Sequence, residues 1–194
     1  MTDRFSRESA ANENPDNTYV SSDKSGATRR NAIRSFISRL ETSMSWVFVA
    51  FLIASILHMT EEYFFPGGFM EVMRRFNPRF APYVTMPMAI VVNGLQLVLC
   101  ALAVVVGNEI LVLGMSVAAL LFINGLMHVG ASIREKGYVP GMATGLLLYM
   151  PISAYAYHRI LTDGRLTITG LLVTVALGIV YQLVPIGYLV AASR

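Results

Sequence analysis

The chain has 194 residues, of which 55% are hydrophobic and only 14% charged, and its formal net charge at pH 7 is +3. This balance excludes an ordinary soluble domain and is typical of a small polytopic membrane protein. The mild positive charge forms no basic patch interleaved with aromatic residues, so we expect no nucleic-acid partner.

The N-terminal stretch, residues 1–42, is a polar tail with a basic flank. Its first 28 residues contain few large apolar side chains, so they cannot bury enough surface to fold, and we expect them to be mostly disordered. The arginines that follow favour the cytoplasmic side of a membrane, namely Arg29, Arg30, Arg34 and Arg39. We therefore expect a protein of the bacterial inner membrane with a cytoplasmic N-terminus.

Five apolar runs make up the remaining domain, residues 43–192, and each is close to the roughly 20 residues that cross a bilayer. They are expected to be helical, because backbone groups in lipid need hydrogen-bond partners within their own segment. The sequence therefore predicts an all-α bundle of about five transmembrane helices in a lipid bilayer. The runs cover residues 43–65, 84–106, 109–131, 141–161 and 167–191, and Pro151 and Pro185 should kink the last two.

A short amphipathic stretch, residues 66–82, separates the first two runs. Its apolar side chains recur at helical spacing, and its charged side chains occupy the other face. This pattern is typical of a helix lying in the membrane interface. The stretch directly follows a pair of glutamates, so it is either a linker or a lid over the site described next. Its apolar members are Phe69, Val72, Met73, Phe76 and Phe80, and its charged members are Glu71, Arg74, Arg75 and Arg79.

Ionisable side chains lie near the end of the first run, in His58-Met59-Thr60-Glu61-Glu62. A charged group within a membrane helix costs roughly 2.5–3.5 kcal/mol to insert, so other interactions must offset that cost. Residues three and four apart share a helix face. Glu61 and Glu62 therefore both lie one turn beyond His58.

The depth of each polar residue follows from the rise of about 1.5 Å per residue in a helix. By this measure Asn124 and His128 of the third run reach the height of His58. Asn93 of the second run and Gln182 of the fifth are outer candidates. His158 lies near the opposite end of the fourth run and is expected to take no part.

The two motifs resemble a known family. His58-x-x-Glu61-Glu62 resembles the motif after which the HXXEE-domain family of membrane proteins is named, and Asn124-x-x-x-His128 resembles the N-x-x-x-H pattern that accompanies it. The resemblance covers the helical region and not the tail. It implies a catalytic membrane protein without implying a particular reaction.

Two imidazoles and one or two carboxylates are a common ligand set for a catalytic metal. We predict that His58, Glu62 and His128 bind a divalent ion, zinc or otherwise iron. Glu61 would act as general base on a metal-bound water, although the spacing does not separate the roles of the two glutamates, so Glu62 is a catalytic candidate too. Asn124 would orient a ligand or the substrate.

Three functions are consistent with these residues. The leading hypothesis is a metal-dependent membrane hydrolase that acts on a lipid or another apolar small molecule. The alternative is a proton- or cation-handling transporter or channel, because intramembrane His and Glu can relay protons. The third is a metal-free network of hydrogen bonds between helices.

Overall fold

The computed structural model describes residues 26, 28, 29, 31, 44–65 and 68–194. The chain divides into two units, Met1–Thr42 and Ser43–Arg194. The predicted disordered tail lies almost wholly outside the described residues. The second unit contains the apolar runs and both motifs.

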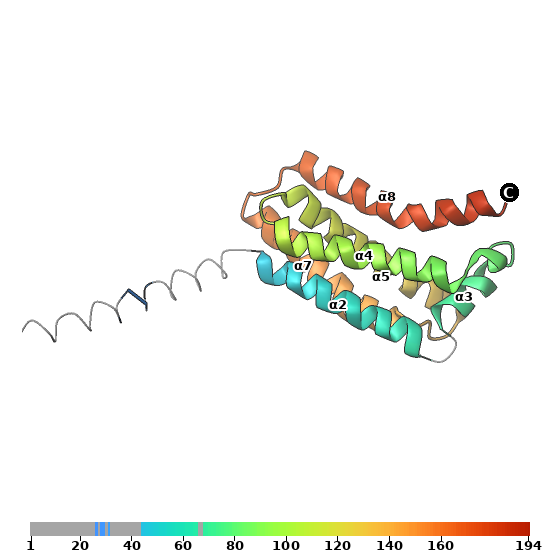
Figure 1. The fold of residues 1–194 in the computed structure, drawn as a ribbon. Helices are drawn as coiled ribbons and strands as arrows, with labels where there is room; N and C mark the ends of the chain where they lie inside the picture. Colours follow the sequence, from blue (N-terminus) through green and yellow to red (C-terminus); the bar gives the residue numbers. More distant parts are fainter. Residues whose placement is uncertain (1–25, 27, 30, 32–43, 66–67) are drawn as a thin grey trace, which may run out of the picture. The chain divides into compact units, whose positions relative to one another are not determined.

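The described part of the second unit is all-helical (Figure 1). Its helices α2, α4, α5 and α8 are each long and apolar enough to cross a membrane, which indicates an integral membrane protein. The remaining predicted span corresponds to α6, η3 and α7, which follow one another without a break. In chain order the elements are α2 (Ser45–Phe64), α3 (Phe69–Phe76), the 3₁₀ turn η2 (Ala81–Tyr83), α4 (Met86–Val106), α5 (Leu111–Glu135), α6 (Met142–Thr144), η3 (Gly145–Tyr149), α7 (Met150–Thr162) and α8 (Ile168–Ala192).

The two prolines expected to disturb helices have different surroundings. Pro151 lies in the first turn of α7, directly after η3, which is a π-helical segment. Because these segments are continuous, the missing N–H of Pro151 interrupts the helical hydrogen bonds at the point where the π-helical segment gives way to α7. Pro185 lies inside α8, and Figure 1 shows that this helix is bent along its length.

Helix α5 is the centre of the bundle and packs against α4, α7, α8 and η3. Its Met115, Val117 and Leu121 are fully buried. Gly125 of α5 meets Gly145 of η3 so closely that a Cβ on either glycine would lie within 2.9 Å of the other's backbone. Such backbone contact is how small residues hold helices together in lipid.

The predicted amphipathic helix is present as α3, and two arginines fix it to its neighbours. Arg74 donates from Nε and Nη2 to the carbonyl of Val84, just before α4, at 3.1 and 2.8 Å. The guanidinium of Arg134, in the last turn of α5, lies 3.8 Å from the ring centre of Phe76. Helix α3 is therefore held across the end of the bundle at which α2 and α5 end.

Candidate metal centre

Helices α2 and α5 bring the three predicted metal ligands together. On α2, Nε2 of His58 lies 3.5 Å from Oε1 of Glu62, and Nε2 of His128 on α5 lies 3.2 Å from the same oxygen. One ligand atom from each of the three residues lies within 4.8 Å of the others. All three side chains are at most 5% exposed. The structure thus forms a buried group that could hold a metal ion.

The spacing of these atoms suits zinc. Two ligand atoms that each lie about 2.0–2.1 Å from a tetrahedral zinc are about 3.3 Å apart. The two nitrogen-to-oxygen separations, 3.2 and 3.5 Å, lie on either side of that value. Two His and one carboxylate also form the ligand set of many ferrous sites.

The hydrogen bond of His128 places a proton on one of its ring nitrogens. Its Nδ1 lies 2.8 Å from the carbonyl oxygen of Pro140, which can only accept a hydrogen bond. The Nδ1 atom must therefore carry the proton. In the neutral ring, Nε2 then presents a lone pair toward Glu62.

Nδ1 of His58 also carries a proton, and a longer chain of hydrogen bonds places it there. The hydroxyl of Thr144 lies 2.5 Å from Oε2 of Glu61 and donates to it, because an ionised carboxylate only accepts. That hydroxyl oxygen lies 2.7 Å from Nδ1 of His58, so it accepts the Nδ1 proton. The buried Nε2 of His58 has no hydrogen-bond partner in the described structure. Metal-binding histidines are typically held in this way through their other ring nitrogen.

The two adjacent glutamates have different surroundings. Besides the Thr144 hydroxyl, Glu61 accepts hydrogen bonds from the backbone N–H groups of Ala143 and Thr144, at 3.0 and 2.8 Å, and from the hydroxyl of Tyr138. The first N–H groups of a helix have no acceptor within the helix, and the Glu61 carboxylate on α2 accepts from two of them at the start of α6. Burial and the hydrogen bond to Glu61 raise the pKa of Tyr138 well above its usual value, so this hydroxyl stays a donor at neutral pH.

Glu62 is oriented by Asn93 of α4. The Asn93 amide donates to Oε2 of Glu62 at 3.1 Å, which leaves Oε1 facing the two histidines. Asn93, an outer candidate in the sequence, is therefore in direct contact with the cluster. Gln182, the other outer candidate, lines a cavity beside the cluster instead.

Asn124, a predicted site residue, and His158, which was expected to take no part, both lie outside the cluster. Asn124 lines the same cavity as His128, and its buried Oδ1 has no hydrogen-bond partner among the described residues. His158 is exposed on α7, in the part of the fourth span that leads away from the cluster. Its Cα lies about 20 Å along the helix axis from Thr144, which agrees with the expectation that it takes no part.

Three further residues shape the site, and the sequence analysis named only Phe69 among them, as part of the stretch that is either a linker or a lid. The ring centre of Tyr149 lies 4.5 Å from that of His58, and the ring centre of Phe69 lies 4.9 Å from that of His128. Gly141 has a φ of +93°, and a Cβ there would lie 2.5 Å from Nδ1 of His128 and 2.8 Å from Cε1 of His58. Gly141 also had a local signal, because a Pro-Gly pair favours a turn in which the glycine has a positive φ.

Two cavities reach the cluster. The larger one, about 920 Å³, lies between α3, α4, α5 and α8 and is lined by Glu62 and His128 among others. The smaller one, about 310 Å³, lies between the end of α2, α3 and the start of α4, and it also reaches Glu62. The cluster is thus buried from bulk solvent but adjoins space for a substrate, as binding sites generally do.

The fold and the cluster define a helical membrane protein with a buried His–Glu–His group at one end of its bundle. Residues 49–156 match the family described as protein of unknown function with HXXEE motif, and the chain belongs to this family. The match includes His58, Glu61, Glu62, Asn124 and His128. No curated protein and no solved structure matches the chain.

Proposed function

We propose that this protein is a metal-dependent membrane hydrolase that holds one divalent ion, zinc or otherwise iron, on His58, Glu62 and His128. The observation that supports this most strongly is the arrangement of protons. Both Nδ1 atoms donate to other groups, so in the neutral rings both Nε2 atoms present lone pairs beside one carboxylate oxygen. Without a metal, one imidazole would have to be a buried imidazolium to give Oε1 of Glu62 a donor, since Asn93 donates only to Oε2.

A divalent ion at this position would lower the pKa of a bound water to about 7 and polarise a substrate carbonyl. The protein's own residues fix the ligands. Asn93 turns Oε1 of Glu62 toward the histidines, and Glu61 holds the ring of His58 through Thr144. Outer partners of this kind typically change metal affinity 10–100-fold when they are removed.

Two carboxylates are candidates for the general base. The sequence analysis assigned this role to Glu61, and that assignment stays a prediction. Glu61 accepts four hydrogen bonds, which favours a positioning role for it. Oε2 of Glu62 accepts one, from Asn93. We propose that Asn124 contacts the substrate, because it lines the cavity together with His128.

Metal analysis of the full chain, purified in detergent without chelators, tests the proposal. We expect about one divalent ion per chain. His58→Ala, His128→Ala and Glu62→Gln should each lose it, because each removes one of three ligands. His158→Ala is the matched control and should keep it. Glu61→Gln should keep some ion if Glu61 is the base or a positioning residue.

Two results would overturn the proposal. The first is folded wild-type protein that binds no metal and takes up neither zinc nor ferrous iron, which would favour the hydrogen-bond network or the proton relay. The second is loss of metal in His158→Ala while His128→Ala keeps it, which would place the site elsewhere. Circular dichroism of each variant shows that loss of metal is not loss of fold.

A further inference from the structure

The larger cavity opens toward the lipid side of the bundle. Helices α4 and α8 both pack on α5 but scarcely touch each other, and the cavity lies between them. Val91 and Leu95 on α4 and Val184 on α8 line it, yet each is more than half exposed. An apolar chain can therefore reach Glu62 and His128 sideways from the bilayer without crossing water.

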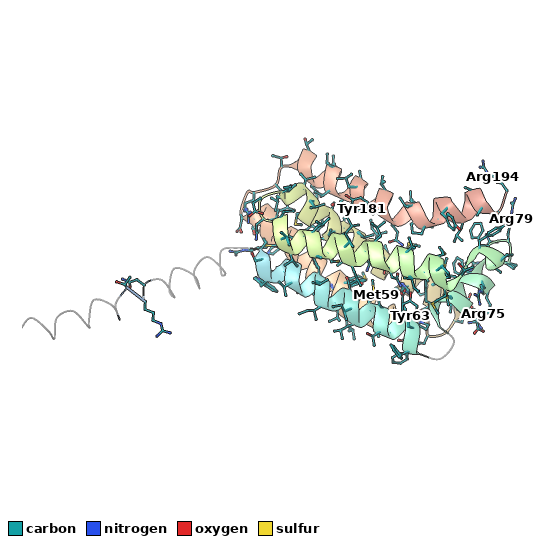
Figure 2. The ribbon with its side chains drawn as sticks, viewed as in Figure 1. Met59, Tyr63, Arg75, Arg79, Tyr181 and Arg194 are labelled. Atoms are coloured by element: carbon teal, nitrogen blue, oxygen red, sulfur yellow. The ribbon has the colours of Figure 1, made fainter. Side chains whose placement is uncertain are left out.

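The end of the bundle around this cavity is basic. In the described chain it carries six Lys or Arg side chains and two exposed carboxylates. Figure 2 shows Arg75 and Arg79 beside α3 and Arg194 at the end of α8, all at the same end of the bundle. Six cations at a membrane surface attract anionic lipids. The cations are Arg74, Arg75, Arg79, Arg134, Lys136 and Arg194, and the carboxylates are Glu71 and Glu135.

Arg134 connects the basic end to the cavity. It is the only Lys or Arg among the described residues that line the cavity. It lies on α5 beyond His128, about 9 Å farther along the helix axis toward the membrane surface. In a glycerophospholipid the phosphate and the acyl esters are a few covalent bonds apart. A phosphate at Arg134 would therefore place an ester carbonyl near the depth of His128 and Glu62.

We infer that the substrate is an anionic glycerophospholipid, with its phosphate at Arg134, an acyl chain in the cavity between α4 and α8, and an ester beside Glu62 and His128. This rests on the proposed function for the reaction but not for the binding. Hydrolysis adds water across the ester: the water oxygen bonds to the acyl carbon, the bond from that carbon to the glycerol oxygen breaks, and a proton passes to that oxygen. The products are a fatty acid and a lysolipid.

Lipid retention by the purified full chain tests the binding. The protein is exposed to equal amounts of phosphatidylglycerol and phosphatidylcholine with identical chains, and native mass spectrometry counts what it keeps. We expect one phosphatidylglycerol per chain, preferred at least tenfold. Arg134→Gln should remove most of that preference. Ala131→Trp, or Val92→Trp on the opposite wall, should reduce binding at least tenfold by filling the cavity.

Matched controls lie away from the cavity. Val105→Trp adds the same ring to an exposed position of α4, and Arg159→Gln removes a cation from α7, and both should bind lipid normally. Equal retention of the two lipids by the wild type would overturn the headgroup assignment. Full binding by both tryptophan variants that fill the cavity would overturn the cavity as the chain's site.

The reaction is tested separately. Metal-loaded protein in phosphatidylglycerol vesicles should release fatty acid, and Glu62→Gln should release none while still retaining the lipid. Lipid retention without fatty-acid release by the metal-loaded wild type would overturn the ester as the reacting bond. If the protein binds no metal, the proposed function fails. The lipid-retention assay on that same metal-free protein still shows whether it binds an anionic glycerophospholipid in the cavity.

Discussion

Replacing Gly141 by alanine should remove metal binding, although Gly141 is not itself a ligand. The new Cβ would lie 2.5 Å from Nδ1 and Cε1 of His128 and 2.8 Å from Cε1 of His58. Carbon contacts are normally about 3.5–4.0 Å long, so the rings would have to move by about 1 Å. Metal sites tolerate deviations of about 0.2 Å, so we expect at least a ~100-fold loss of zinc affinity.

The backbone at Gly141 adds a separate effect on stability. Its φ of +93° is costly for a residue with a Cβ, by about 1–2 kcal/mol. Gly164 is a matched control, because its φ is +64° but a Cβ there meets nothing within 4 Å. Gly164→Ala should therefore lose a similar amount of stability and keep its metal. Gly130→Ala, in open space within α5, should lose neither.

The assay is a zinc titration against a competing chelator, with thermal unfolding measured in the same detergent. Gly141→Ala with wild-type zinc affinity would refute the close contact between this backbone and the two histidine rings. Equal metal loss in Gly164→Ala would show that the effect is general destabilisation rather than displacement of the ligands.

Two other predictions concern the hydrogen-bond chain and the topology. Thr144→Val removes the hydroxyl between Glu61 and His58 and should weaken zinc binding about 10–100-fold in the same titration, whereas Thr144→Ser keeps a hydroxyl and should bind zinc like the wild type. Equal affinity in the wild type and both variants would show that this hydrogen-bond chain does not support the site. Reporter fusions at Arg75 and Glu135 should report the same side of the membrane, opposite to the N-terminus; opposite sides for these two positions would contradict the bundle.

That three side chains meet in one buried cluster could be predicted from sequence, because their meeting depends on regular geometry. A constant rise per residue sets the depth of His58, Glu62 and His128, and a spacing of four keeps His58 and Glu62 on one face. Where the chain is regular, counting residues is enough to show which side chains can meet. The helical bundle and the short amphipathic helix α3 were predictable for the same reason.

The different surroundings of Glu61 and Glu62 could not be predicted, because they depend on an irregular segment. In the sequence, Glu61 and Glu62 are adjacent carboxylates with nothing to distinguish them. In the structure, Tyr138, Ala143 and Thr144 donate hydrogen bonds to Glu61 alone. Those contacts need the left-handed turn at Gly141, which periodicity does not predict. The end of α5 was also underestimated, since this helix continues to Glu135 rather than ending at residue 131.

The π-helical segment η3 has a consequence for changes in chain length. Thr144 contacts one edge of the His58 ring and Tyr149 contacts its face. In an α-helix, residues five apart point about 140° away from each other, whereas the wider π turn brings them onto the same face of the helix. Deleting one residue between them would restore ordinary α geometry with little rotation of the start of the fourth span against α7, because a π turn absorbs one extra residue. A relative with a one-residue gap at this place would therefore still present both contacts to its first histidine, from positions four apart rather than five.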